Sequence, residues 1–193
     1  MRYRPNSIRL RGHDYLNPGI YFITICAKDR QQLFGRINDN KMMLNLYGRI
    51  VYTKWIDIAR HFKNAHVDVF QIMPDHLHGI IILTDTIDND TVGVKHSRQE
   101  ATLNALNPGG NASPLRDQQP YKSLHPNGTK PGSISAIMQN FSSITTRIIN
   151  NIRRTPGKKL WQRGFYDHII RSQNELSAIR HYIINNPVNW NKK

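Results

Sequence analysis

The chain has 193 residues with 27 Lys and Arg against 13 Asp and Glu, which gives a formal net charge of +14. This length suits one domain with a sizeable core, and the charge excess is typical of a nucleic-acid partner. A membrane partner is disfavoured, because no apolar run approaches the roughly 20 residues that span a bilayer and the basic residues do not form one amphipathic helix. Since Met1 leads into no signal-peptide core and the single cysteine, Cys26, has no internal disulfide partner, we expect a cytoplasmic protein in which Cys26 is a small core residue.

Four predicted elements occupy the first half of the chain. Residues 19–27 are rich in β-branched and aromatic side chains and predict a strand. Apolar residues then recur three and four apart, which predicts an amphipathic helix over 43–62. Residues 67–73 and 76–84 form a predicted antiparallel pair of strands with a tight turn at Pro74-Asp75.

The second half of the chain begins with a region that lacks an apolar period. Residues 85–130 contain several prolines and glycines, and this composition indicates a flexible insertion. Apolar spacing then predicts a helix over about 133–154, and residues 160–170 predict a fourth strand. A short terminal helix is expected over about 174–186, where Pro187 would stop it.

The order strand, helix, strand, strand, helix, strand, helix is that of an α+β ferredoxin-like sandwich with an added C-terminal helix. We therefore expect an antiparallel sheet with helices on one face and a single domain over residues 1–193. The other face of the sheet would be free to carry a ligand, whose nature the fold alone does not identify.

Two histidines mark the start of the third predicted strand, in the segment Met73-Pro74-Asp75-His76-Leu77-His78-Gly79. Successive side chains of a strand point to opposite faces, so His76 and His78 project from one face while Leu77 projects from the other. Two imidazoles directed at one point make half of a metal site. Taken alone, the pattern is more often a solvated strand end or a satisfied pair of core histidines.

The terminal helix carries the second set of candidate residues, Tyr182 and Asn186, which are four residues apart and would share one helix face. Taken alone, Tyr182 reads as an amphipathic core residue and Asn186 as a helix-end residue. Taken with the histidine pair, two imidazoles and an amide oxygen can hold a divalent metal with open positions. A tyrosine hydroxyl beside that metal can attack a bound phosphodiester.

These patterns resemble the single-tyrosine HUH transposases of insertion sequences, and most closely the REP-associated tyrosine transposases. The resemblance runs nearly end to end and implies that His76 and His78 are metal ligands and Tyr182 is the nucleophile. It also implies that Asn186 is the third protein ligand, in the place where better-known insertion-sequence members have Gln. The matching segments are Ser7-Ile8-Arg9-Leu10-Arg11-Gly12, residues 21–26, Leu33-Phe34-Gly35, residues 73–79, residues 161–171 and residues 182–188.

The activity implied by this resemblance is a transesterification on single-stranded DNA. Tyr182 would attack a backbone phosphate, forming a 5′-phosphotyrosine link and freeing a 3′-hydroxyl that can reverse the step. Mg²⁺ or Mn²⁺ suits this role, whereas a closed zinc site would need a fourth protein ligand. The implied substrates are short hairpin repeats with single-stranded flanks, and the implied assembly is a monomer or a homodimer.

Basic residues interleaved with aromatic residues suit single-strand binding. The candidate DNA contacts are Arg9, Arg11, Arg163, His168 and Arg171. For His168, assistance in proton transfer and a purely structural role are open alternatives. Tyr166 is a rival nucleophile, although its aromatic neighbours favour packing or base stacking.

Two other functions explain less of the sequence. A non-catalytic or domesticated nucleic-acid-binding module on the same fold would leave the complete set of site residues without a use. A small metal hydrolase that activates water at His76 and His78 would leave Tyr182 unexplained.

Overall fold

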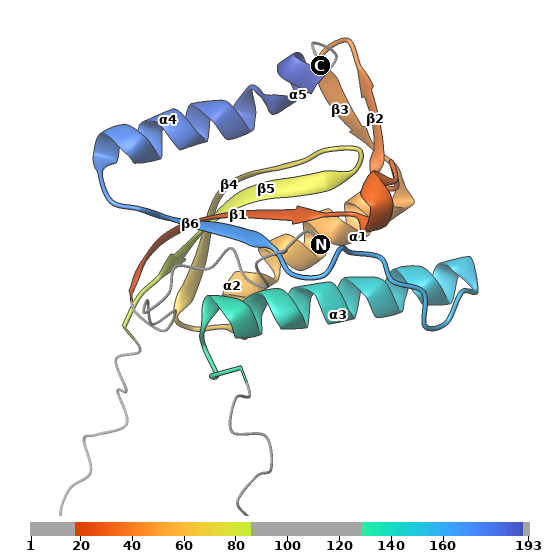
Figure 1. The fold of residues 1–193 in the computed structure, drawn as a ribbon, viewed down its shortest axis with the longest axis horizontal. Helices are drawn as coiled ribbons and strands as arrows, with labels where there is room; N and C mark the ends of the chain where they lie inside the picture. Colours follow the sequence, from red (N-terminus) through yellow and green to blue (C-terminus); the bar gives the residue numbers. More distant parts are fainter. Residues whose placement is uncertain (1–17, 86–128, 191–193) are drawn as a thin grey trace, which may run out of the picture. The chain divides into compact units, whose positions relative to one another are not determined.

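A four-stranded antiparallel sheet forms the centre of the structure (Figure 1). This computed structural model describes residues 18–85 and 129–190. The strands are β1 (Gly19–Cys26), β4 (Ala65–Ile72), β5 (His76–Leu83) and β6 (Tyr166–Ile170). They lie in the order β4, β5, β1, β6, and helices connect them as in a ferredoxin-like sandwich, which confirms the expected α+β class.

Strand β5 is one of the two inner strands and pairs with β1 and β4 on its two sides. All but one of its eight residues are buried, because the strand has neighbours at both edges and helices over both faces. The tight turn expected at Pro74-Asp75 joins β4 to β5 and is confirmed. Because it is contacted at both edges and on both faces, β5 can hold functional side chains in fixed positions.

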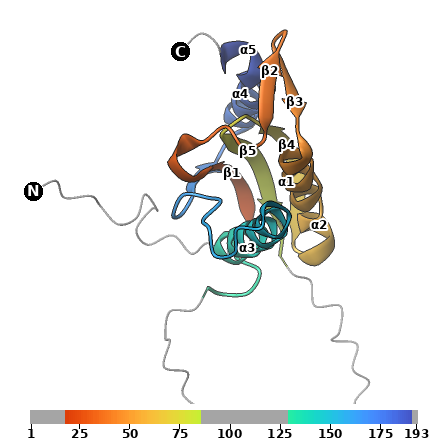
Figure 2. The same cartoon turned by 90° about the vertical axis from the view of Figure 1, so that its right-hand side faces the viewer.

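Three helices cover one face of the sheet (Figures 1 and 2). They are α1 (Leu46–Ile56), α2 (Ile58–His61) and α3 (Ile134–Arg153). The core beneath them centres on Trp55 of α1 and Phe141 of α3, whose rings meet edge to face with centroids 5.2 Å apart. Leu77 and Ile81 of β5 are buried in the same cluster, so Leu77 faces away from His76 and His78 as the alternation along a strand predicts.

The opposite face is partly covered by α4 (Gln173–Ile184), which is followed by α5 (Asn186–Asn189). Figure 1 shows α4 and α3 on opposite sides of the sheet. Leu176 and Ile183 of α4 are buried with Ile80 and Ile170 of the sheet in a small cluster separate from the main core. The expected added C-terminal helix is thus present, but the second sheet face is not free, because α4 must bury its own apolar side chains there.

The first predicted helix, 43–62, is wrong at its beginning, where the structure has a hairpin of β2 (Gly35–Asn38) and β3 (Lys41–Leu44). Its two loop residues, Asp39 and Asn40, both have positive φ, at 47° and 59°, as a two-residue hairpin turn requires. Each strand has only four residues, too few for an alternating pattern to be visible. A single 3-10 turn, η1 (Lys28–Arg30), joins β1 to this region.

Two predicted boundaries near the C-terminus are also wrong. The fourth strand begins at Tyr166 rather than at residue 160, and Trp161 forms only an isolated bridge with Ala27. Pro187 does not stop the terminal helix, which already ends at Ile184; it lies in the first turn of α5. Proline is tolerated there because its missing N–H would have no partner within the helix.

Most of the predicted insertion, residues 86–128, lies outside the described residues and stays a prediction. Within the described residues, no helix is both long enough and apolar enough to cross a membrane.

Gly79 lies where β5 passes over Trp55, and a Cβ atom at this position would come within 2.5 Å of Trp55 Cζ2. Trp55 is fully buried, so its ring has little room to move aside. We predict that Gly79→Ala lowers the free energy of unfolding by about 1–3 kcal/mol, the usual cost of overpacking a core. Urea denaturation measures this change.

The control for this prediction is Trp55→Phe, which removes Cζ2 and completes a double-mutant cycle. In the Trp55→Phe background, Gly79→Ala should cost less than in the wild type. An equal cost in both backgrounds would show that the contact with Trp55 is not the cause.

Candidate active site

The turn that carries the histidine motif is fixed by backbone hydrogen bonds. The Ala27 N–H donates to the Asp75 carbonyl at 2.8 Å, and the Phe34 N–H donates to the Pro74 carbonyl at 3.0 Å. The Met73 N–H closes the turn by donating to the His76 carbonyl at 2.8 Å. These bonds tie the start of β5 to the end of β1 and to the segment before β2. The backbone that carries the two histidines is therefore fixed in position.

His76 and His78 lie on the sheet face that α4 covers, as the alternation predicted. Both are buried, at 5% and 7% exposed. Their Nε2 atoms are 3.0 Å apart, and the two rings meet edge to face. The two imidazoles therefore converge on one point.

Hydrogen bonds on the other ring nitrogens hold the imidazoles in place. His76 Nδ1 contacts the Asp75 carboxylate, and His78 Nδ1 contacts Thr24 Oγ1 at 2.7 Å. A carboxylate only accepts, so His76 Nδ1 carries a proton and, in the neutral ring, Nε2 keeps its lone pair. Arg30 lies 3.5 Å from the other Asp75 oxygen and offsets the charge of this buried carboxylate.

The donor chemistry of the pair fits a divalent ion. An ion with a metal–nitrogen distance of about 2.1 Å can reach both Nε2 atoms at their observed separation, and the carboxylate behind His76 is the usual outer partner of a metal-bound histidine. Among the described residues, no group of three or more His, Cys, Asp or Glu forms a metal cluster.

Tyr182 of α4 lies against this pair, with its hydroxyl oxygen 3.4 Å from His78 Nε2. Its ring meets the His78 ring edge to face at a centroid distance of 5.3 Å and the Phe22 ring at 6.1 Å. The residue is nevertheless 48% exposed. Its phenol is thus held beside the histidines while remaining accessible to a large substrate.

Polar contacts of two residues, Arg180 and Glu175, position α4 over the sheet. Arg180 donates from Nε to Asp68 of β4 at 2.8 Å. At the other end of the helix, Glu175 accepts from the Arg171 backbone N–H at 2.8 Å and contacts His168 of β6 at 2.6 Å. The hydrogen bond from the Arg171 amide, and then that from His168, lower the pKa of the Glu175 carboxyl, so it accepts as a carboxylate at neutral pH.

Asn186, the expected third ligand, is the first residue of α5 and is half-buried. The expectation that Tyr182 and Asn186 share one face of a continuous helix is wrong, because α4 ends at Ile184. The role of Asn186 as a metal ligand stays a prediction. Sequence reasoning missed Trp190, whose ring lies tilted over His76 with centroids 5.9 Å apart.

The rival nucleophile Tyr166 and the cysteine Cys26 also lie on this face. Tyr166 of β6 is 41% exposed and meets Phe22 edge to face at 6.3 Å, so both tyrosines flank one phenylalanine. Cys26 is not a core residue as expected: it is only partly buried and lies opposite His76 in the register of β1 and β5. Burial raises the pKa of the Cys26 thiol, which keeps it protonated and unreactive at neutral pH.

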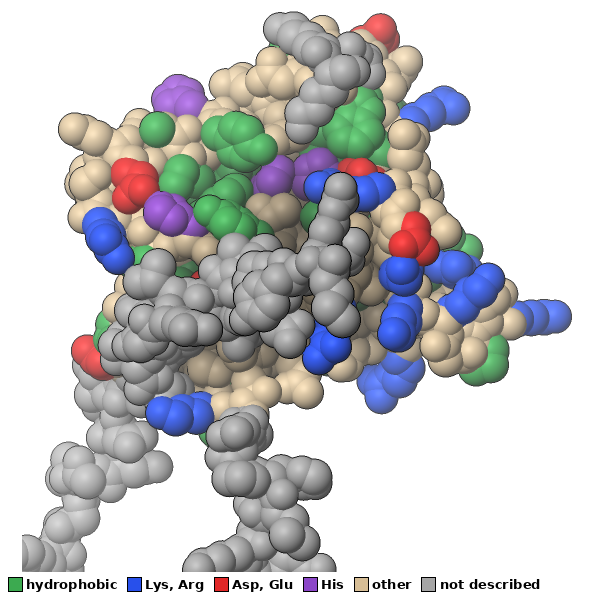
Figure 3. All heavy atoms as spheres, in the orientation of Figure 1, with side chains coloured by type: hydrophobic (Ala, Val, Ile, Leu, Met, Phe, Trp, Pro, Cys, Tyr) green, Lys and Arg blue, Asp and Glu red, His purple; other side chains and the backbone are tan. Residues whose placement is uncertain are grey.

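The predicted DNA contacts divide into three groups. Arg163 and Arg171 are exposed, and His168 is held by Glu175, while Arg9 and Arg11 lie outside the described residues. Figure 3 shows histidine and hydrophobic side chains gathered on the upper part of one face, with Lys and Arg side chains around its right and lower sides.

Comparisons with known proteins bear on the family and the fold of the chain. No family model matches the chain. An uncharacterized protein of Haemophilus influenzae is 34% identical over 184 residues, which cover 95% of this chain and 88% of the relative. A REP-associated tyrosine transposase, solved bound to a REP hairpin, aligns with a TM-score of 0.51 at 17% identity over 98% of this chain and 73% of that chain. The chain therefore belongs to the same family as the Haemophilus influenzae protein, and its fold is that of the REP-associated tyrosine transposase.

Proposed function

We propose that the protein cleaves and rejoins single-stranded DNA beside hairpin repeats, with Tyr182 as the nucleophile and a divalent ion, Mg²⁺ or Mn²⁺, at His76 and His78. The observation that carries the proposal is the 3.4 Å separation between the Tyr182 hydroxyl and His78 Nε2. The net charge of +14 supports a DNA partner. The fold shared with a transposase solved on a REP hairpin supports hairpin DNA as the substrate class.

The proposed step is an exchange of phosphodiester bonds. The Tyr182 oxygen bonds to phosphorus, the bond from phosphorus to the 3′-oxygen breaks, and the 3′-oxygen takes up a proton while the phenol loses one. The downstream strand stays attached through a 5′-phosphotyrosine link. Because one phosphodiester replaces another, the freed 3′-hydroxyl can reverse the step without a nucleotide cofactor.

The residues of this chain prepare that step in three ways. His76 and His78, with Asn186 as a third candidate, would hold the ion, and Asp75 and Thr24 orient the two rings. When bound, the ion would supply Lewis-acid polarisation of the phosphate. The exposed rings of Tyr166 and Tyr182 offer aromatic surface for unpaired bases.

The test of the nucleophile is Tyr182→Phe, which removes one oxygen and keeps the ring that packs on Phe22 and His78. We predict that this variant binds DNA but gives no covalent adduct. The substrate is a 3′-end-labelled single strand carrying the hairpin repeats that flank the protein's own gene, since the downstream fragment is the one that stays attached. A denaturing gel with Mg²⁺ or Mn²⁺ detects the adduct.

Tyr166→Phe is the matched control, because Tyr166 lies on the same face and also contacts Phe22. It should retain the adduct. An adduct that persists in the Tyr182 variant and vanishes in the Tyr166 variant would move the nucleophile to β6. Absence of an adduct from the wild type with both ions would leave a non-catalytic DNA-binding module as the better description.

A second prediction concerns the histidines. His76→Ala and His78→Ala should each reduce adduct formation by more than about 100-fold, since residues that merely orient metal ligands are worth about 10–100-fold. DNA binding should remain, and circular dichroism should show a folded protein. His66→Ala, at an exposed position of β4, is the control. Normal cleavage by either variant, or by wild type in excess chelator, contradicts the metal assignment.

A third prediction addresses Asn186. Asn186→Ala should weaken Mn²⁺ binding about 10-fold or more, in line with the loss of a ligand or its support, while leaving DNA affinity unchanged. Asn189→Ala, at an exposed position of the same short helix, should not. Titration of Mn²⁺ followed by electron paramagnetic resonance separates the two. Equal Mn²⁺ affinity in all three proteins would remove Asn186 from the ligand set.

A further inference from the structure

We infer that a groove between α3 and the segment 154–165 binds the phosphate backbone of the paired stem of hairpin DNA. The inference rests on the proposed function for the identity of the partner. It assigns that partner a second surface, which we call the α3 groove, away from the histidines and Tyr182. None of the residues that line it belongs to the candidate active site.

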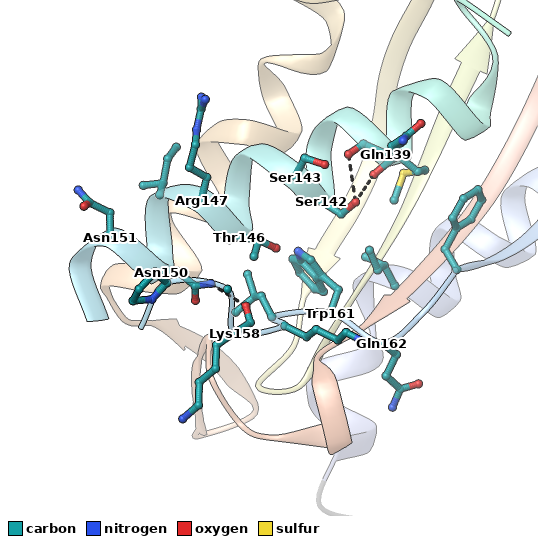
Figure 4. A pocket seen from close by; sticks show the side chains of 18 of the residues that line it. Gln139, Ser142, Ser143, Thr146, Arg147, Asn150, Asn151, Lys158, Trp161 and Gln162 are labelled. Carbon is teal, nitrogen blue, oxygen red and sulfur yellow. Dashed lines mark hydrogen bonds between the residues drawn. The ribbon is translucent and has the colours of Figure 1, made fainter. Parts of the chain in front are cut away.

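The α3 groove is a large open trough with a volume of about 1330 Å³. One wall is the polar side of α3, and the other is formed by Pro156–Gln162 and by Gly164 and Phe165. Figure 4 shows Gln139, Ser143 and Arg147 along the helix, with Lys158 and Gln162 on the opposite wall. Trp161 lies at the floor, where its indole N–H donates to Thr145 Oγ1 at 2.9 Å.

The charged residues that line the groove are all basic. Residues 129–165, which supply nearly all of its lining, include no Asp or Glu. Arg147, Arg154, Lys158 and Lys159 line it and are exposed. A local excess of fixed positive charge with no acidic group in the same segment is the electrostatic complement of a phosphate backbone.

The helix wall carries an ordered row of hydrogen-bonding groups. Gln139, Ser143, Arg147 and Asn151 are four residues apart and all exposed, so they form one ridge along α3. At 1.5 Å of rise per residue, the row is about 18 Å long. Amide, hydroxyl and guanidinium groups of this kind make the phosphate and sugar contacts that position DNA without reading its sequence.

Of the lining residues that the structure describes, the two aromatic ones are Trp161, which is buried, and Phe165, which is half-buried, and this favours a paired stem over a single strand. Single-strand sites stack bases on aromatic side chains, but the Trp161 ring is buried between Phe34 and Phe141, at centroid distances of 4.9 and 5.7 Å. Among the described residues that line the groove, Ile152 is the one large hydrophobic side chain that is exposed. A duplex keeps its bases inside and presents phosphates, which is what this surface can contact.

The test compares two triple variants of the full-length protein that each remove three positive charges. Arg147→Gln/Lys158→Gln/Lys159→Gln changes the α3 groove, and Lys41→Gln/Arg49→Gln/Lys63→Gln changes exposed residues that do not line it. Fluorescence anisotropy measures binding to a hairpin with an unpaired flank and to the flank alone, over a range of salt concentrations. The backbone groups of Lys158 that bond to Thr155 and Asn150 are untouched, so both variants should melt at the wild-type temperature.

We expect the groove variant to lose about 10-fold or more in hairpin affinity at 0.1 M salt, with its log–log salt slope reduced by up to about 2.7, since each phosphate contact on duplex DNA contributes about 0.9. The control variant should lose far less, and binding of the flank alone should be equal in both. Equal losses in the two variants overturn the inference, as does a groove variant that loses the flank as strongly as the hairpin.

Two further measurements distinguish a loss of DNA binding from a loss of folding and from a failure of the proposed chemistry. Should the triple groove variant melt early, Lys158→Gln/Lys159→Gln alone decides the question, because both side chains are exposed in a loop. The Tyr182-dependent adduct is measured on the hairpin-bearing strand described above, at a concentration that saturates both proteins, and it should form normally in the groove variant. If the groove variant loses stem affinity but the wild type forms no adduct, the groove is supported and the proposed chemistry is rejected. If the wild type forms the adduct but the groove variant keeps its stem affinity, the chemistry is supported and the groove is rejected.

Discussion

The alternation of side chains along β5 is the constraint on which both faces of the molecule depend. Leu77 and Ile81 enter the core beneath α1 and α3, whereas His76, His78 and Ile80 face α4. A shift of one residue in the pairing of β5 would bury the histidines in the apolar core and place leucine beside the tyrosine. The hydrogen bonds at Pro74 and Asp75 fix that register, so the same few bonds specify the core and the site.

The parts of this arrangement that were predictable from the sequence are local ones. The shared face of His76 and His78 follows from the period of a strand, and the turn before them follows from Pro74 and Asp75. The proximity of Tyr182 and His78 joins residues 104 positions apart, and no local pattern contains it; a family resemblance suggested it, and the packing of α4 produces it.

The sequence-based predictions that were wrong or missing also have physical causes. The hairpin of β2 and β3 has strands too short to show a period, although Asp39 and Asn40 carry the turn chemistry that its loop needs. Trp190 follows the end of α5, where no periodicity indicates which way a side chain points, so its contact with His76 was not foreseeable. The spacing of Tyr182 and Asn186 predicts that both lie on one helix, since spacing alone does not reveal that α4 ends at Ile184.

The two surfaces differ in the chemistry they offer to DNA. The face around Tyr182 has exposed tyrosine rings and a buried imidazole pair, which suits an unstacked strand and a single phosphate. The α3 groove has charge and uncharged donors without exposed rings, which suits repeated contacts along a backbone. The two proposals thereby assign affinity and chemistry to different elements, and they predict that a change in one surface leaves the other's contacts intact.

The small cluster beneath α4 has a consequence for how firmly the site is assembled. The histidines belong to the sheet and share the stability of the large core. Tyr182 belongs to a helix that is held by the small cluster around Leu176 and Ile183 and by two contacts to the sheet, Arg180 with Asp68 and Glu175 with His168. Elements with few buried contacts open at a lower free energy than the whole fold. The distance between the Tyr182 hydroxyl and His78 is therefore set by an equilibrium, in which α4 can separate from the sheet and return while the sheet beneath it stays folded.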